Sequence, residues 1–380
     1  MKRTPLFAVH QKLGGKLIEF GGWEMPVQYT SITDEHLAAR QAAGLFDISH
    51  MGEVWIEGPQ AEAFLNQVLT NDLRKLAPGH GQYTLMCNEQ GGVIDDLYAY
   101  RLGPDEYLLV INASRISNDL AWLQEQLSRF GPGAGVRLRD ASEATGALAV
   151  QGPRVAQFIN QCFPGPWTGG AAVEVPAALK KNQTARTQLA GRQVWVSRTG
   201  YTGEDGFEIV APGDVIEAIW NRLLELGRPY GLKPAGLGAR DTLRTEACYP
   251  LYGHELNETT TPLEAGLGFF VALNKGEFTG RPVLAEQKLK GVSRKLVAFK
   301  MAAKSAPPRP HYPIWSQGEA GRRIGEVSSG TQSPSLGIGL GMALLPSQFA
   351  QPQTPLAIEI RGQRAGALVV PKPFYAANAK

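Results

Sequence analysis

Two adjacent carboxylates, Asp95 and Asp96, stand in the middle of a segment, residues 91–100, that otherwise has the composition of a β-strand. Strands normally avoid Asp. Because successive side chains on a strand alternate between its two faces, Asp96 is predicted to share a face with Tyr98 and Tyr100. A carboxylate among aromatic and aliphatic side chains is costly when it is unpaired. We therefore expect this acid to have a function.

A second strand, predicted over residues 82–87, precedes this segment and is joined to it by a turn that contains Gly91 and Gly92. Glycine adopts the positive φ angles that such turns require. Pairing of the two strands would place Tyr83 on the same surface as Asp96. Flat aromatic rings and one acid suit a flat heterocycle with N–H donors. The alternative is an edge-strand Asp that is hydrogen-bonded to loop amides.

A glycine-rich turn joins two further predicted strands within residues 197–208, and Glu208 begins the second of them. The turn lacks the GK[ST] sequence of a phosphate-binding P-loop. The Glu208 carboxylate is a candidate bidentate acceptor for the amidine-like N–H edge of a flat ring. The alternative is a surface hairpin with a solvated Glu.

Residues 234–247 have the pattern of a glycine loop that begins a helix, on which Arg240 and Arg244 lie four residues apart and therefore on one face. Two aligned arginines at such a helix start favour a carboxylate or phosphate ligand. Alternatively, Asp241 pairs with Arg244 at the surface, an interaction that contributes little to stability.

The composition is that of a folded protein of two or three domains, with 380 residues, 43% hydrophobic and 19% charged. A net charge of +3 without a basic run argues against nucleic-acid binding. The sequence contains no 18-residue apolar run and does not begin like a signal peptide. We therefore expect a cytoplasmic protein that does not enter membranes.

The cysteines and histidines carry no metal motif. Cys87, Cys162 and Cys248 form no CxxC pair, and the six histidines form no HxxH or HExxH pair, so no metal site is predicted. Cys87 is interpreted as a small hydrophobic strand residue, with a nucleophile as the alternative.

Hydrophobic patterns predict the elements that position these residues. Helices are expected over residues 31–43, 60–69, 117–129, 154–162 and 215–226, and strands over residues 52–57, 107–111, 147–151 and 193–198. The order of elements in residues 52–129 is typical of an α+β unit with an antiparallel sheet. Short β-type runs at residues 295–301, 323–328, 337–344, 356–361 and 366–371 predict a C-terminal β-barrel or sandwich.

Taken together, motifs spread over the whole chain resemble one known family. They are TPL at residues 4–6, GWEMP at 22–26, GLFDISHMG at 44–52, ND at 71–72, the stretch 88–97, QGP at 151–153, TGYTGEDGFE at 199–208, GLGARD at 236–241, LYG at 251–253, FTGR at 278–281, residues 328–337 and KPF at 372–374. Their order resembles that of the T-proteins of the glycine cleavage system, the tetrahydrofolate-dependent aminomethyltransferases.

The resemblance implies an α+β multidomain protein, a clover-like three-lobed fold with antiparallel α/β units and a C-terminal β-barrel lobe. The implied lobes are residues 1–53 with 137–280, which bind folate, residues 54–136, which carry the Asp96 hairpin, and residues 285–380.

The resemblance also implies a reaction and a site. The enzyme would transfer the methylene of an aminomethyl group, carried on the lipoyl arm of the H-protein, to tetrahydrofolate, giving 5,10-methylenetetrahydrofolate, ammonia and dihydrolipoyl H-protein. Asp96 would be the acid beside the folate N5/N10 edge. The implied binding residues are Glu208 and Tyr201 at the pterin, Arg240 in the folate region, and Tyr83, Tyr98, Tyr100 and Met51 around the cavity, although a Met is more commonly a core residue.

Three stretches depart from the family pattern: His254 replaces an expected Gln, residues 180–184 lack an aromatic residue near the pterin, and Cys248 has changed neighbours. One alternative function is a non-catalytic folate-binding protein that supports iron–sulfur enzymes, but Cys248 lacks the Lys-Gly pair expected there. Another is the folate-dependent half of a flavin amine dehydrogenase. That class would need a fused Rossmann domain, which is not expected here because the first family motif begins at Thr4.

Overall fold

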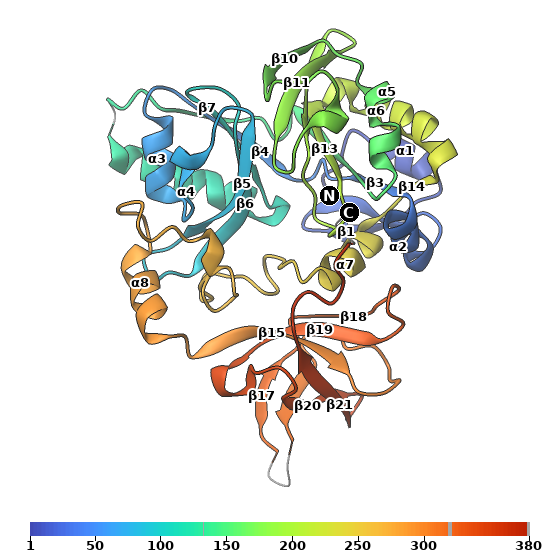
Figure 1. The fold of residues 1–380 in the computed structure, drawn as a ribbon, viewed down its shortest axis with the longest axis vertical. Coiled ribbons are helices and arrows are strands. Elements are labelled where there is room, and N and C mark those ends of the chain that lie inside the picture. The colour runs from blue at the N-terminus through green and yellow to red at the C-terminus, as the bar shows by residue number, and fades with distance from the viewer. Residues whose placement is uncertain (132, 318–320, 378–380) are drawn as a thin grey trace. The chain divides into compact units, whose positions relative to one another are not determined.

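The computed structural model describes residues 1–131, 133–317 and 321–377 of the chain (Figure 1). They form two compact units, the first comprising Met1–Thr84 with Asp96–Arg240 and the second comprising Leu85–Asp95 with Asp241–Lys380. Helices and largely antiparallel sheets make up the chain, so the predicted α+β, multidomain fold is confirmed. No helix in the described ranges is both long and apolar enough to span a membrane.

The first unit contains a seven-stranded sheet. Its strands are β3 (Ala43–Asp47), β9 (Thr145–Gln151), β10 (Trp167–Gly170), β11 (Thr184–Leu189), β12 (Arg192–Ser197), β13 (Gly206–Pro212) and β14 (Leu232–Pro234). The order is β10-β11-β12-β13-β9-β3-β14, and the pairs are antiparallel except that β14 runs parallel to β3. This sheet carries Glu208 on β13, next to the turn that follows β12.

Helices cover this sheet with apolar faces. They are α1 (Phe7–Lys12), α2 (Ile32–Gln41), α5 (Ile159–Cys162) and α6 (Gly213–Gly227), and a two-stranded hairpin, β1 (Lys16–Phe20) and β2 (Trp23–Gln28), accompanies them. Helix α6 packs against β9, β13 and β14 and buries Ile216, Trp220 and Leu223. The Ser31 hydroxyl caps α2 by accepting a hydrogen bond from the Asp34 N–H at 3.1 Å, as its sequence position predicts.

A five-stranded sheet carries the Asp95–Asp96 pair. Its strands are β4 (Gly52–Glu57), β5 (His80–Cys87), β6 (Val93–Arg101), β7 (Glu106–Ile111) and β8 (Arg137–Asp140), in the order β5-β6-β7-β4-β8. Helices α3 (Ala61–Val68) and α4 (Ile116–Phe130) belong to the same stretch of chain. The strand–helix–strand–strand–strand–helix order is therefore as predicted, and β4 and β6 both pair antiparallel with β7.

The second unit contains the C-terminal sheet, drawn orange to red in Figure 1. Its strands are β15 (Arg294–Met301), β16 (Pro313–Ser316), β17 (Arg323–Glu326), β18 (Ser329–Gln332), β19 (Gly339–Pro346), β20 (Pro355–Ile360) and β21 (Gln363–Val370), and the unit also holds α8 (Arg281–Lys290). The order is β17-β16-β20-β21-β15-β19-β18. Because β17 also contacts β19, the sheet curls as a barrel does.

The structure differs from the sequence-based elements in two ways. The helix predicted over residues 154–162 is a 3-10 turn, Val155–Gln157, followed by the short α5, because the fully buried Phe158 has φ −125° and interrupts helical geometry. Strands β1, β2, β3, β8, β10, β11, β14, β16 and β18 were not predicted. These strands have three to six residues, too few for a clear alternating pattern.

Candidate functional site

Asp96 lies on β6, an internal strand between β5 and β7, and its side chain is half-buried. It is therefore not the edge-strand Asp of the structural alternative. Its neighbour Asp95, on the opposite face, is fully buried. The acid predicted to face the aromatic residues is thus the one that a ligand can reach.

Two side chains fix the Asp96 carboxylate. The Tyr83 hydroxyl donates a hydrogen bond to Oδ2 at 2.9 Å, which confirms that Tyr83 and Asp96 share a surface. The Asn112 amide, just after β7, donates to Oδ1 and to the backbone carbonyl of Asp96, both at 3.0 Å. Hydrogen bonds to both oxygens favour the ionised carboxylate and hold its orientation.

Tyr98 and Tyr100 continue the same face of β6. Their ring centroids are 4.8 Å apart with an interplanar angle of 36°. A Cβ on Gly81 of the adjacent strand would overlap both rings, so glycine at this position lets them lie across β5. The face therefore presents Asp96 beside a flat aromatic surface.

A hydroxyl chain connects this face to Glu208 on the other sheet. The Tyr100 hydroxyl lies 2.8 Å from Thr199 Oγ1, and Thr199 Oγ1 donates to Glu208 Oε2 at 2.5 Å. Burial raises the pKa of Tyr100 well above its ordinary value, and the negative charge of Glu208 adds to this, so the phenol stays protonated. Glu208 is thus held by Thr199 through one of its two oxygens.

Arg240, on helix α7 (Leu237–Glu246), lies close enough to Glu208 on β13 to feel its charge. Its guanidinium is 4.8 Å from the centroid of the Tyr201 ring, a cation–π contact that joins two of the predicted residues. Burial lowers the pKa of Arg240, an effect that the charge of Glu208 opposes. Arg240 Nη1 is buried and has no hydrogen-bond partner within the described residues. A buried donor of this kind is costly unless a ligand or water satisfies it.

Arg244 does not form the predicted anion-binding pair with Arg240. Its side chain is 2% exposed and bonds Asp241 at 2.6 Å, Glu255 at 3.0 Å and Ser329 at 2.8 Å. Its donors are thereby engaged inside the second unit. The salt bridge between Arg244 and Asp241, which was the alternative expected from the sequence, is present. It is one part of a buried network.

His50 and Met51 lie in the loop between β3 and β4. Met51 is half-buried there. His50, which the sequence reasoning did not select although it adjoins Met51 in the GLFDISHMG motif, is 3% exposed. Burial, against the opposing charge of Asp47 and helped by the positive charge of Arg240, lowers the pKa of His50 to about 4, so the imidazole is neutral near pH 7.

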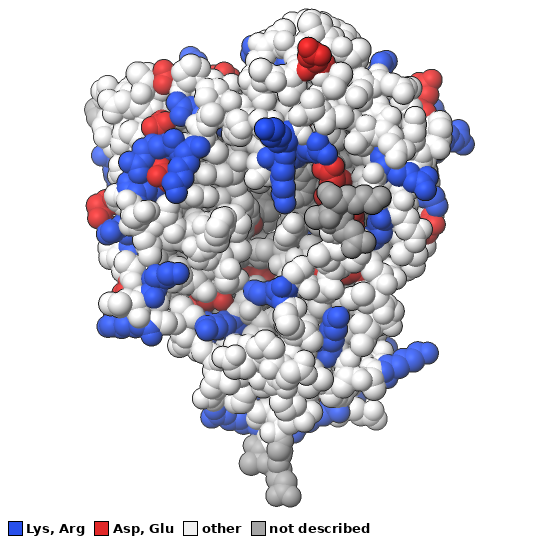
Figure 2. All heavy atoms as spheres, in the orientation of Figure 1, with Lys and Arg blue, Asp and Glu red and all other residues white. Residues whose placement is uncertain are grey.

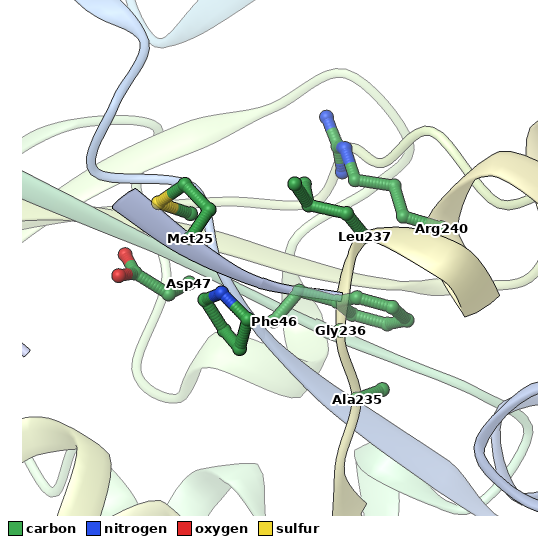
Figure 3. Close-up of a pocket in the computed structure, with 8 residues that line it drawn as sticks. Met25, Phe46, Asp47, Ala235, Gly236, Leu237 and Arg240 are labelled. Atoms are coloured by element: carbon green, nitrogen blue, oxygen red, sulfur yellow. The ribbon is translucent and has the colours of Figure 1, made fainter. Parts of the chain in front are cut away.

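A narrow gap with essentially no room for a water molecule lies next to Arg240. Figure 3 shows that the Arg240 guanidinium and the Asp47 carboxylate point to opposite sides of its lining, which also includes Met25, Phe46 and Leu237. Ligand pockets begin at about 300 Å³, so this gap is not one. It does not itself hold a ligand of folate size.

The structure shows where two of the departures from the family pattern lie. Residues 180–184 lie against the start of β5, where Gly81 N–H donates to the Asn182 carbonyl at 2.8 Å. His254 is exposed and its Nδ1 lies 2.9 Å from the Ser328 carbonyl oxygen. Cys87 is fully buried and burial raises its pKa, which agrees with a packing role.

The visible surface carries mixed charge. Figure 2 shows Lys and Arg side chains in separate small groups with Asp and Glu among them. Within the described ranges, no group of three or more His, Cys, Asp or Glu could hold a metal ion.

Sequence reasoning missed Asn112, Thr199 and His50, which touch or adjoin the predicted residues. Thr199 lies in the glycine-rich turn, which was selected for its glycines, and Asn112 directly follows a predicted strand. Only pairing between segments about 100 residues apart reveals the Tyr100–Thr199 contact.

Comparisons with known proteins agree over the full chain. A family model described as the GCVT N-terminal domain matches residues 6–275, and one described as the glycine cleavage T-protein C-terminal barrel domain matches residues 294–376. Aminomethyltransferases of Bacillus mycoides and Bacillus cereus are 47% and 48% identical over 376 residues, covering 99% of this chain and 98% of each relative. The crystal structure of glycine cleavage system aminomethyltransferase T from Bartonella henselae matches with a TM-score of 0.89 at 33% identity, covering 99% of this chain and 98% of that one.

Proposed function

This chain belongs to the glycine cleavage T-protein family and is an aminomethyltransferase; we propose that tetrahydrofolate accepts its one-carbon unit and that a lipoylated H-protein supplies it. The products are 5,10-methylenetetrahydrofolate, ammonia and dihydrolipoyl H-protein. The carboxylate of Asp96, held between Tyr83 and Asn112 next to two tyrosine rings, is the observation that carries this proposal.

Asp96 acts on the reacting edge of tetrahydrofolate. An N–H of the folate donates to the carboxylate, which orients the attacking nitrogen toward the methylene carbon as ammonia leaves. Proton management by a positioned carboxylate typically contributes ~10²–10⁴-fold to the rate. Since Tyr83 and Asn112 already fix the carboxylate, little reorientation is needed during the reaction.

Glu208, Tyr201 and Arg240 bind the remainder of the folate. Glu208 accepts hydrogen bonds from the amidine-like edge of the pterin, and Tyr201 contacts the ring. The buried donor of Arg240, Nη1, fits an acceptor atom of the bound folate. Tyr98, Tyr100 and Met51 line the cavity, and holding both carriers in line while excluding water supplies the rest of the acceleration.

A single-turnover reaction of the wild-type protein with aminomethylated H-protein tests the proposal. We expect ammonia and methylenetetrahydrofolate to appear together, and only when tetrahydrofolate is present. H-protein without its lipoyl group is the control and should give neither product. If tetrahydrofolate binds but ammonia is not released, the chain is a non-catalytic folate-binding protein. If folate does not bind, the acceptor has been wrongly assigned.

A further inference from the structure

Thr199 Oγ1 lies within hydrogen-bond distance of both the Tyr100 hydroxyl and Glu208 Oε2, and the residue is 7% exposed. A hydroxyl has one proton to donate. Because the Glu208 carboxylate can only accept hydrogen bonds, Thr199 Oγ1 must donate its proton to Glu208 Oε2. It therefore accepts a hydrogen bond from the Tyr100 hydroxyl. The direction of the chain is therefore fixed, from Tyr100 through Thr199 to Glu208.

The turn that carries Thr199 is held rigidly. The fully buried Gln151 amide donates to the Thr199 carbonyl at 3.0 Å and accepts from the Thr202 hydroxyl at 2.9 Å. A Cβ on Gly200 would overlap the Gln151 side chain, so glycine is required for this close approach. Arg40 also bonds the Thr202 carbonyl at 2.8 Å. The backbone thus places the Thr199 hydroxyl before any ligand binds.

Thr199 consequently sets how Glu208 faces its ligand. On β13, Glu208 is paired with Ser197 of β12, which fixes its backbone, and Thr199 fixes its carboxylate through Oε2. Oε1 has no hydrogen bond to any part of the chain that the structure describes, and it remains for the ligand. A hydrogen bond to a charged group is stronger than one between neutral groups, so this contact favours one orientation of the carboxylate.

We propose that Thr199 is a positioning residue for folate binding, which holds Glu208 in the orientation that receives the pterin edge, and that the Tyr100 hydroxyl acts through Thr199. This inference rests on the proposed function, because Glu208 must contact the folate. It separates two parts of Tyr100: the ring lines the cavity, while the hydroxyl supports Glu208 and does not bond the ligand.

A double-mutant cycle tests whether Thr199 acts through Glu208. The dissociation constant of tetrahydrofolate is measured for Thr199→Val, Thr199→Ser, Glu208→Gln and the Val–Gln double variant. We expect Thr199→Val to weaken binding about tenfold and Thr199→Ser, which keeps the hydroxyl, by less than about threefold. Adding Thr199→Val to Glu208→Gln should change affinity by less than about twofold. For Thr199→Val, the single-turnover rate at saturating folate should change far less than the dissociation constant.

Thr202→Val is the matched control, because Thr202 is buried in the same turn and bonds Gln151 but not Glu208. Any weakening that it causes should be the same in the wild-type and Glu208→Gln backgrounds. Tyr100→Phe provides a second variant should Thr199→Val fold poorly. It keeps the ring, and its effect should be in the same direction and be lost when Glu208 is Gln.

Two results would overturn the inference. If Thr199→Val weakens binding equally with and without the Glu208 carboxylate, Thr199 stabilises the turn and does not position Glu208. If Glu208→Gln leaves folate affinity unchanged, the assignment of Glu208 in the proposed function fails, and that of Thr199 fails with it. Loss of ammonia release with all affinities behaving as expected would instead contradict the proposed reaction alone.

Discussion

Asp96 combines partial exposure with hydrogen bonds on both carboxylate oxygens. A buried acid bonded on both oxygens would be structural, and a free surface acid would be poorly oriented. The half-buried position between Tyr83 and Asn112 provides a carboxylate that is oriented before the ligand arrives. In the proposed function, the enzyme uses pre-positioned acceptors, Asp96 at the reacting edge and Glu208 at the pterin.

Removing the Tyr83 hydroxyl tests this orientation. Tyr83→Phe keeps the ring but takes one donor from Asp96, so we expect the single-turnover rate to fall about tenfold, with folate affinity changing less. Tyr107→Phe is the control, since that hydroxyl lies 3.5 Å from Glu62 in the same sheet region and away from Asp96. Equal rates for wild type and Tyr83→Phe would show that the hydroxyl does not orient the acid.

Strand β4 carries a buried ionisable group that the site does not use. Glu53 on this strand is fully buried, and Thr145 Oγ1 donates to its Oε2 at 2.9 Å. Burial raises the pKa of Glu53 to about 8, with the charge of Asp140 adding to the effect. The folded chain therefore keeps a proton that an unfolded chain has released above about pH 4.5, and stability must fall as the pH rises through this window.

Glu53→Gln should remove this pH dependence. Between pH 6.5 and 8 we expect the free energy of unfolding of the wild type to fall by about 1–2 kcal/mol relative to the variant. This range avoids His50, whose lowered pKa acts in the opposite direction below about pH 6.5. Denaturant unfolding at each pH measures the difference. Glu57→Gln, at the exposed end of the same strand and paired with Arg137, should leave the dependence in place.

The two arginines of helix α7, Arg240 and Arg244, have different roles. Arg240 is a candidate ligand residue, whereas Arg244 is saturated by Asp241, Glu255 and Ser329. Helical spacing put both on one face, but the burial of Arg244 depends on residues 11 and 85 positions further along the chain. Spacing within one helix could not have revealed that.

Arg244→Met should therefore destabilise the protein. Removing the arginine leaves Glu255 buried without its cation, which typically costs about 3–5 kcal/mol. Arg323→Met, which breaks an exposed pair with Glu326, should cost less than about 1 kcal/mol. Denaturant unfolding compares the two variants. If Arg244→Met weakened folate binding without destabilising the chain, the original anion-binding interpretation would be restored.

Across the molecule, the sequence predicted what local rules determine. Strand alternation placed Tyr83, Asp96, Tyr98 and Tyr100 on one surface, and short β-type runs together with the family resemblance predicted the C-terminal barrel sheet. What it could not predict are contacts that only the fold creates, such as Tyr100 with Thr199. Short strands such as β16 and β18 were not predicted for a related reason: their pairing partners define them more than their own residues do. The division into three lobes remains a prediction.

The most direct test of Asp96 as the chemical centre is the single-turnover rate of methylenetetrahydrofolate formation from aminomethylated H-protein, wild type against Asp96→Asn. The amide keeps the shape and can still be held by its neighbours, but it cannot carry the charge. We expect the rate to fall by about 10²-fold or more while the dissociation constant of tetrahydrofolate changes only a few-fold. An unchanged rate with normal folate binding would contradict a chemical role for Asp96.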